Sequence, residues 1–414
     1  MKKKEEIMED ENIDTTKEIV TIKKEGFSYP EMVIIMVIAI LFGFLIGNVV
    51  SFTKKETTNS SVPSELKEFV DTYNDIVNNY YDKVNKEELI DAGIKGMINY
   101  LDDPYATYFD GTSSTNFNQT LEGNYEGVGI EVTLDNNKVK ITKVFADTPA
   151  KKAGIKVGDY ITKVNGESVE GKSLSDVVSL IKNAKNKEVE ITITRDNQEK
   201  AMKVTRTTVD MPYTSSKVYE ENGKKIGYLK IEMFSNNITK QVKKELESLK
   251  KKNIDKLVID ARDNPGGYLT QVTEILSLFM TKKDVIYQLQ TKNNKEKVYS
   301  TSSKATYSYP VVVLINENSA SASEILASAF KETYNAEIVG VNSYGKGTVQ
   351  KTGDLNNGDT IKYTVQKWLT PKGNWINEKG VTPTKEVKLE LKENEPLTED
   401  NDNQLKAAIE LASK

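Results

Sequence analysis

The chain has 414 residues, enough for a membrane anchor and two or three folded domains, and its 57 basic and 61 acidic residues leave a net charge of −4. No basic block stands out, so nucleic acid is not an expected partner. The chain contains neither cysteine nor histidine, which excludes disulfides, thiol nucleophiles, Ser–His–Asp triads and the H-E-x-x-H metalloprotease motif. The base of a hydrolase built from this chain must therefore be a lysine, a carboxylate or a metal-bound hydroxide.

The first 52 residues predict a tail and a membrane anchor. Residues 1–31 are polar, of mixed charge and without an apolar period, as in a disordered tail. Residues 32–52 are apolar on every helical face and long enough to cross the hydrocarbon layer, and no A-x-A site follows them as it would in a cleaved signal peptide. Lysines are more numerous before this span than just after it. We therefore expect a single-pass protein of the cell membrane with a cytoplasmic N-terminus and an extracytoplasmic remainder.

A polar linker, residues 53–63, leads into an N-terminal helical region over residues 64–116. Apolar residues recur there at helical spacing, and a second short helix is predicted near residues 87–100. Such a stripe must be buried somewhere, either against a second copy of the chain in a homodimer or against the rest of the same chain. The stripe comprises Leu66, Phe69, Val70, Tyr73, Ile76, Val77 and Tyr80.

Residues 117–210 alternate strand and turn signals around one predicted helix, residues 174–182. Ser173 and Asp176 resemble a capping pair at the start of this helix, and Asn165-Gly166 is a strong signal for a tight turn. The strands are predicted near residues 127–133, 138–144, 160–164 and 189–195.

Two runs in this region, residues 153–166 (AGIKVGDYITKVNG) and residues 125–130 (YEGVGI), resemble a PDZ domain of the circularly permuted type found in bacterial proteases. In such a domain the second run binds a carboxylate, because glycines let successive backbone N–H groups turn toward one anion, and the strand after it can pair with an extended peptide. An ordinary hairpin entry is the simpler interpretation of its two glycines. The resemblance assigns the carboxylate loop to Gly127, Val128, Gly129 and Ile130.

Residues 211–385 show strands alternating with helices, which indicates an α/β core. Buried strands are expected near residues 226–231 and 256–260. The segment after the second strand, residues 260–267 (DARDNPGG), joins it to a predicted helix near residues 269–279. A Pro-Gly-Gly turn at such a place can present backbone N–H groups into a cleft, although a plain turn explains it equally well.

A second segment, residues 316–325 (NENSASASEI), follows a predicted strand at 311–315. A helix begins within it, so Ser321 lies where a neighbouring N–H group and the helix dipole would favour an oxyanion. Ser321 and Glu324 also match a capping box, which is the simpler interpretation in isolation. The small residues on both sides of Ser321 leave space for a substrate and favour the catalytic interpretation.

A third segment, residues 344–350 (YGKGTVQ), contains a lysine between two glycines. Lys346 and Gln350 are four residues apart, so on a strand their side chains share a face. A solvated lysine in a turn is the alternative. To act as a base Lys346 must be neutral, so burial must lower its pKa by several units.

These three segments, together with residues 101–109 (LDDPYATYF), resemble the carboxy-terminal (tail-specific) processing protease family of serine endopeptidases. The resemblance covers nearly the whole chain after the apolar span. It implies acyl transfer by a serine nucleophile and a lysine base, a glutamine that orients the lysine amine, and an oxyanion hole of two backbone N–H groups. In this sequence those residues are Ser321, Lys346, Gln350, Gly267 and Ala322.

The resemblance also implies a crotonase/caseinolytic-protease-like α/β core with an inserted, mostly-β PDZ domain, behind the N-terminal single transmembrane helix. Residues 386–414 are expected to be a C-terminal tail with a helix near residues 402–414, a second candidate contact for a dimer. No cofactor or metal is expected, and the implied partners are proteins or peptides with accessible C-termini. Two other functions stay open: a catalytically inactive PDZ scaffold and an acyl-CoA enzyme on the same fold.

Overall fold

The structure is a computed structural model that describes residues 63–392 and 395–414. Its contacts divide the chain into two compact units, Met1–Leu89 and Ile90–Lys414. The predicted tail and transmembrane helix, residues 1–52, lie outside the described residues. Within the described ranges, no helix is long and apolar enough to cross a membrane.

The first unit contributes the short helix η1 (Ser64–Leu66) and helix α2 (Lys67–Asn79), and helix α3 (Lys86–Tyr100) begins at its end. The predicted apolar stripe is present, but α2 buries none of its residues. Phe69 is 54% exposed and Tyr80 is 57% exposed. The described part of this unit therefore leaves the stripe without a partner.

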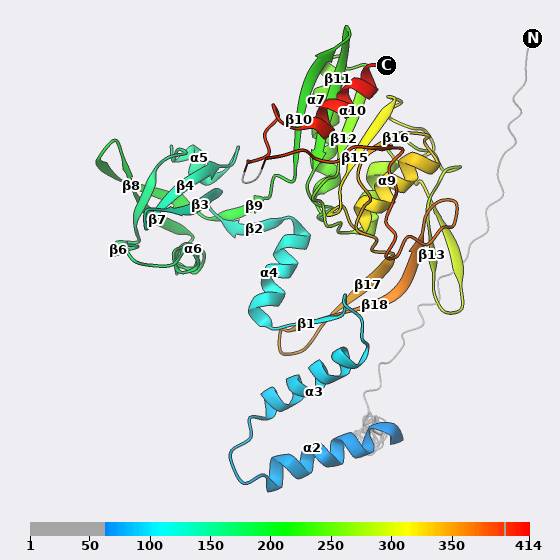
Figure 1. The fold of residues 1–414 in the computed structure, drawn as a ribbon. Coiled ribbons are helices and arrows are strands. Elements are labelled where there is room, and N and C mark those ends of the chain that lie inside the picture. Colours follow the sequence, from blue (N-terminus) through cyan, green and yellow to red (C-terminus); the bar gives the residue numbers. More distant parts are fainter. Residues whose placement is uncertain (1–62, 393–394) are drawn as a thin grey trace, which may run out of the picture. The chain divides into compact units, whose positions relative to one another are not determined.

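The predicted PDZ region contains a six-stranded antiparallel sheet (Figure 1). Its strands run in the order β3-β4-β5-β7-β8, and the short β6 pairs with β5, so β3 lies at an edge of the sheet. A capping box formed by Ser173 and Asp176 begins helix α6, as predicted. The bounds are β3 Ile130–Asp135, β4 Lys138–Val144, α5 Pro149–Lys152, β5 Tyr160–Val164, β6 Glu167–Ser168, α6 Leu174–Lys182, β7 Glu188–Arg195 and β8 Gln198–Thr205.

The predicted strand at residues 127–133 is wrong at its start. Gly127 ends a separate strand, β2 (Asn124–Gly127), which pairs with β9 (Thr207–Asp210) where the chain enters and leaves the region. Gly129 has φ +87°, a left-handed conformation that breaks the extended backbone between β2 and β3. The first residue of the edge strand is therefore Ile130.

A buried ion pair explains the Gly-Asp step in the run that resembles a PDZ domain. Asp159 is 1% exposed and accepts hydrogen bonds from the Arg195 guanidinium at 2.6 and 2.7 Å. It also accepts one from the Lys156 backbone N–H at 2.7 Å. These bonds fasten the loop before β5 to the end of β7.

The main sheet runs in the order β10-β11-β12-β15-β16-β19, and every pair except β10–β11 is parallel. Helices α7, α8 and α9 contribute to one apolar cluster and α10 to another, and successive residues of the sheet alternate between the two clusters. The bounds are β10 Thr214–Glu221, β11 Lys224–Ile231, α7 Ile238–Lys251, β12 Lys256–Asp260, α8 Leu269–Leu276, β15 Val311–Ile315, α9 Ala322–Glu332, β16 Glu337–Gly340, β19 Lys385–Glu386 and α10 Asn403–Ser413.

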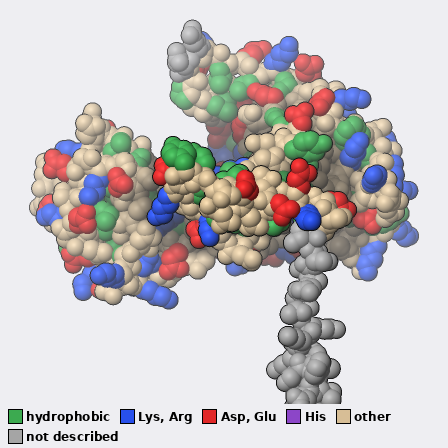
Figure 2. Space-filling model, turned by 90° about the horizontal axis from the view of Figure 1, so that it is seen from below, with side chains coloured by type: hydrophobic (Ala, Val, Ile, Leu, Met, Phe, Trp, Pro, Cys, Tyr) green, Lys and Arg blue, Asp and Glu red, His purple; other side chains and the backbone are tan. Residues whose placement is uncertain are grey.

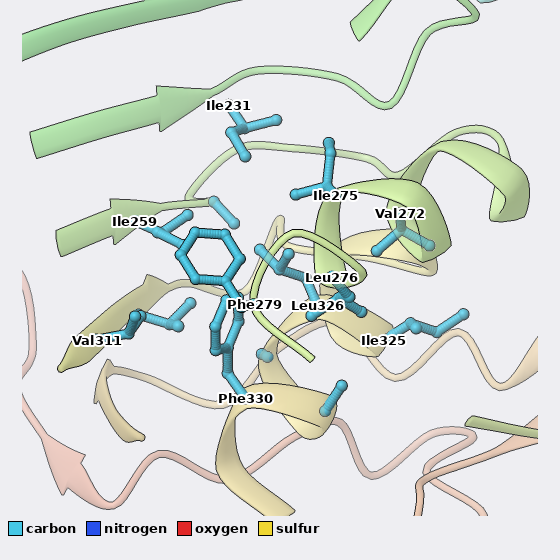
Figure 3. Packing of buried hydrophobic residues seen from close by; sticks show 14 of the residues in the cluster. Ile231, Ile259, Val272, Ile275, Leu276, Phe279, Val311, Ile325, Leu326 and Phe330 are labelled. Carbon is cyan, nitrogen blue, oxygen red and sulfur yellow. The ribbon is translucent and has the colours of Figure 1, made fainter. Parts of the chain in front are cut away.

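The larger cluster fills the space between the sheet and helices α8 and α9 (Figure 3). Phe279 and Phe330 meet there edge to face, with ring centroids 5.3 Å apart, close to Val311 of the sheet. Both phenylalanines are almost completely buried. This packing anchors α9, the helix that begins directly after Ser321.

The C-terminal helix α10 packs on the opposite face of the same sheet (Figure 1). Leu405 and Ala408 are buried against Val258 and Leu314. Arg262, which is 5% exposed, donates hydrogen bonds to the carboxylates of both Asp260 and Asp402. The apolar face that was a candidate dimer contact is therefore buried within the chain.

A second sheet runs in the order β1-β18-β13-β14, with β17 also pairing with β18. The sequence interpretation missed this arrangement, because its strands are far apart in the chain. The bounds are β1 Thr107–Phe109, β13 Val285–Gln290, β14 Lys295–Tyr299, β17 Thr348–Asp354 and β18 Thr360–Leu369, and helix α4 spans Gly111–Glu122. On the face drawn in Figure 2, basic and acidic side chains are interspersed rather than gathered by sign.

Candidate active site

The three segments singled out from the sequence follow three neighbouring parallel strands. Strand β12 pairs with β15, and β15 pairs with β16, so their carboxyl ends meet at one edge of the sheet. Clefts outside the carboxyl ends of parallel strands are the usual binding sites of α/β proteins. A cavity of about 520 Å³ lies here, and its lining includes Ser321, Lys346, Gln350, Gly266 and Gly267.

Ser321 has φ 55° and ψ −113°, a conformation that a residue with a side chain rarely adopts. The predicted capping box is present, and in it the Ser321 N–H donates to the Glu324 carboxylate at 2.7 Å. The Glu324 N–H donates to the Ser321 carbonyl at 2.9 Å. Backbone strain like that of Ser321 is typical of functional sites.

The two predicted oxyanion donors, the N–H groups of Gly267 and Ala322, make no hydrogen bond within the described residues. The Pro-Gly-Gly turn is pressed against the serine segment, since a Cβ on Gly266 would lie 2.8 Å from Cβ of Ser321. A Cβ on Gly267 would lie 2.2 Å from the Phe234 carbonyl oxygen. Only glycines allow this approach, which brings Gly267 to the cavity and the turn close to the Ala322 nitrogen, 3.0 Å from a Cβ placed on Gly266.

Lys346 lies in the loop between β16 and β17. Burial and, to a smaller extent, the positive charge of Lys362 lower the pKa of its amine to about 8, against the opposing effects of Asp103 and Glu324. The amine lies 4.7 Å from the ring centroid of Tyr105. The side chain is thus in the environment that a neutral lysine base requires, as the sequence interpretation demanded.

Lys346 and Ser321 line the same cavity, but no hydrogen bond joins the hydroxyl to the amine in residues 63–392 and 395–414. Gln350 lines the cavity too, yet its amide donates to the hydroxyls of Thr348 at 2.9 Å and Thr364 at 3.2 Å. A register shift in the β17–β18 ladder lies between Val349 and Gln350. The structure therefore brings the three side chains together without the hydrogen bonds expected between them.

Glu324 has a role that the sequence interpretation did not anticipate. Its carboxylate is fully buried and accepts hydrogen bonds from the Ser343 hydroxyl at 2.6 Å and from the N–H groups of Gly345 at 2.7 Å and Lys346 at 2.9 Å, besides that of Ser321. Burial raises its pKa, although these hydrogen bonds oppose the shift. One carboxylate thus connects the serine segment to the lysine segment. The capping-box spacing was the only sequence signal for it.

The lysine segment is also held by its carbonyl groups. The indole N–H of Trp368 donates to the Lys346 carbonyl at 2.7 Å, and that of Trp375 donates to the Gly347 carbonyl at 2.9 Å. A Cβ on Gly345 would lie 3.0 Å from three backbone nitrogens of residues 378–380. The backbone on both sides of the lysine is therefore fixed, and its side chain is the part free to move.

The predicted carboxylate loop lies between β2 and β3. No backbone hydrogen bond is donated by Val128 or Gly129 to another backbone group of the described chain, whereas their carbonyls accept from Ala150 and Phe145. A Cβ on Gly129 would lie 2.3 Å from Cβ of Thr148. The loop leads directly into β3, an edge strand that an extended peptide could join.

Comparisons with known proteins agree with this organisation. Residues 225–387 match the family described as peptidase family S41, residues 140–195 match a PDZ domain, and residues 46–113 match the activating protease CtpB N-terminal domain.

Three relatives align over most of their length. The chain is 39% identical over 343 residues to the carboxy-terminal processing protease CtpB of Bacillus subtilis, covering 80% of this chain and 71% of that protein. It is 36% identical to CtpA of the same organism, covering 84% and 73% respectively. It is 33% identical to a probable CtpA-like serine protease of Staphylococcus saprophyticus, covering 92% and 77%. The chain therefore belongs to the carboxy-terminal processing proteases, the serine peptidases of family S41, and carries a PDZ domain.

Proposed function

We propose that the protein is a membrane-anchored serine endopeptidase that recognises substrate C-termini through its PDZ domain and cleaves peptide bonds with a Ser321–Lys346 pair. One observation carries the proposal: Ser321, a lysine of lowered pKa and Gly267 with its uncommitted N–H group line one cavity, and the uncommitted N–H group of Ala322 directly follows Ser321. A nucleophile, a base and an oxyanion hole are the parts that acyl transfer requires.

In the proposed reaction, neutral Lys346 removes the proton of the Ser321 hydroxyl as its oxygen attacks the peptide carbonyl. The N–H groups of Gly267 and Ala322 donate to the oxyanion of the tetrahedral intermediate. Protonated Lys346 then gives its proton to the leaving amine, so an acyl group remains on Ser321. Water, deprotonated by Lys346, attacks the acyl carbon and releases the new C-terminus and the free serine.

The missing serine–lysine hydrogen bond fits a resting enzyme. In proteins without substrate, catalytic hydrogen bonds are often long and shorten only in the complex. We propose that capture of a substrate C-terminus by the PDZ domain is coupled to movement of the Lys346 side chain away from Tyr105 and toward Ser321. Gln350 would then exchange a threonine hydroxyl for the lysine amine.

The test is cleavage of a permanently unfolded reporter protein by the full-length chain, followed by gel electrophoresis and mass spectrometry. Ser321→Ala and Lys346→Ala are expected to lose activity by orders of magnitude, whereas Lys351→Ala, an exposed lysine in the same segment, is expected to keep it. Activity retained by either of the first two variants would refute the site. An inert wild type would favour the inactive scaffold.

Recognition by the PDZ domain has a separate test. Gly129→Ala places a Cβ against Thr148 and strains a residue at φ +87°. We expect KM to rise for long substrates while cleavage of short peptides is unchanged, because the substitution does not touch the catalytic cavity. Equal effects on both substrate lengths would contradict C-terminal capture by this loop.

The membrane anchor and the dimer belong to the same proposal. Residues 32–52 are expected to keep the protein in the pellet after carbonate extraction of membranes, and their deletion to release it. The exposed stripe of η1 and α2 supports association of two chains, which Phe69→Glu is expected to reverse in light scattering. Release of the full-length protein by carbonate would refute the membrane anchor. An unchanged mass of Phe69→Glu would refute the dimer contact.

A further inference from the structure

The catalytic cavity contains a second lysine, Lys362, which takes no part in the proposed proton transfers. Lys362 lies on β18 and lines the cavity together with Ser321 and Lys346. Its backbone is held on both sides, because it is paired with Thr107 of β1 and with Thr352 of β17. The position of this side chain is therefore set by the centre of a sheet rather than by a loop.

The amine of Lys362 has no ionic partner in the described parts of the chain: no carboxylate lies within ion-pair distance, and no hydrogen bond reaches it. Its surroundings are aromatic, since it lies 5.3 Å from the ring centroid of Phe109 and 5.4 Å from that of Phe117. These rings favour a cation but cannot accept its three N–H bonds in the way that a carboxylate does.

The charged groups that influence this amine are few. Burial lowers the pKa of Lys362, and Asp103 opposes the shift. Lys346 is the second positive charge of the cavity, and the two lysines repel each other. A partly buried ammonium group without a counter-ion, in a cavity that receives a peptide, is a site for an anionic group of that peptide.

We propose that Lys362 forms a subsite of the catalytic cavity that binds a carboxylate of the peptide substrate. The inference rests on the proposed function and deepens it, because it names a chemical class that the cavity selects. The apolar part of the lining, Phe117, Leu121, Met233 and Leu269, would hold the aliphatic part of the same substrate residue. Two sources fit the chemistry: the C-terminal carboxylate of a short peptide and the side chain of a glutamate or aspartate.

The test compares four peptides of one sequence on the full-length enzyme: a free or amidated C-terminus, each combined with glutamate or glutamine at single positions near the cleaved bond. In one of the two kinds of pair, wild type is expected to cleave the peptide with the carboxylate with a kcat/KM at least about tenfold above that of the matching amide peptide. Most of this difference should be a lower KM. Lys362→Met is expected to abolish the preference. Lys362→Arg, which keeps the charge, is expected to retain most of it.

Lys351→Met is the matched control, because Lys351 is exposed on the neighbouring strand β17 and does not line the cavity. It is expected to preserve the preference. The PDZ loop is unchanged in all variants, so only a change in the ratio between paired peptides reports on Lys362. If Lys362→Met removes the preference between the free and the amidated peptide, the bound carboxylate is the C-terminus. If it removes the preference between glutamate and glutamine, the bound carboxylate is a side chain.

A second readout follows from charge. A carboxylate bound to Lys362 offsets the positive charge that lowers the pKa of Lys346, so the acidic limb of kcat, which reports the enzyme–substrate complex, should lie at higher pH for the preferred peptide than for its neutral partner. A merely structural lysine would not produce this difference.

The inference is overturned if wild type shows no preference in either pair, or if folded Lys362→Met, checked by circular dichroism, keeps the preference. Failure of the proposed function looks different: wild type would then cleave none of the peptides, or Ser321→Ala would cleave them as well as wild type.

Discussion

The lowered pKa of Lys346 makes a quantitative prediction about pH. The base is the neutral amine, so activity must rise as the pH rises through the pKa, which is about 8. A lysine with the ordinary pKa of 10.5 would be neutral roughly 300-fold less often at pH 7. We therefore expect kcat/KM to rise about tenfold per pH unit between pH 6 and 7 and to level off above pH 8.

Two substitutions should move this acidic limb in opposite directions. Glu324→Gln removes a negative charge that raises the pKa of Lys346, so the limb should move to lower pH. Lys362→Met removes a positive charge that lowers it, so the limb should move to higher pH. Glu324→Gln should also lower kcat at least tenfold, because an amide cannot accept all four of the hydrogen bonds that the carboxylate receives.

The assay is the initial rate of cleavage of a neutral, amidated peptide between pH 5.5 and 10, at substrate concentrations well below KM. Glu332→Gln, near the end of the same helix, is the control for a charge change outside the cavity and should leave the limb in place. A limb near pH 4 to 5 would indicate a carboxylate base and refute the reasoning. So would a limb that neither Glu324→Gln nor Lys362→Met moves.

Two further substitutions test the oxyanion segment and its support. Gly267→Ala should lower kcat by about 10²- to 10³-fold with little change in KM, because the new Cβ collides with the Phe234 carbonyl and displaces the N–H donor. Steady-state kinetics on the folded variant measures this loss. An unchanged kcat would show that the Gly267 N–H has no catalytic role. Asp402→Ala should lower the free energy of unfolding by about 3 kcal/mol, because it removes one carboxylate from the buried Arg262 guanidinium. Urea unfolding measures this change. A decrease of less than about 1 kcal/mol would contradict a stabilising role of the ion pair.

The sequence predicted correctly those helices and strands whose ends are marked by residues close to them in the chain. Strands β4, β5 and β15 and helix α6 have the predicted bounds, because turn residues, a capping pair and continuous apolar runs mark their ends. The start of β3 was misplaced because alternation continues through Gly129, and only its positive φ shows the break. The resemblance to the processing proteases also predicted that Ser321, Lys346 and Gln350 would come together, and all three line one cavity.

The remaining features depend on contacts between distant residues. Glu324 lies 21 and 22 residues from the N–H groups of Gly345 and Lys346 that it holds, so spacing alone could not distinguish this role from a cap. Lys362 enters the cavity only because β18 pairs with both β1 and β17. The detailed likeness of the core to the crotonase and caseinolytic folds, and the domain boundaries, stay predictions.

The most direct test of the central claim is the identity of the acylated residue. The full-length protein would be treated with a serine-reactive acylating probe, digested and mapped by mass spectrometry, in parallel with Lys346→Ala and the control Lys351→Ala. The proposed mechanism predicts one modified serine, Ser321, with labelling strongly reduced in Lys346→Ala and unchanged in the control. Modification of a different serine, or equal labelling of Ser321 without Lys346, would contradict it.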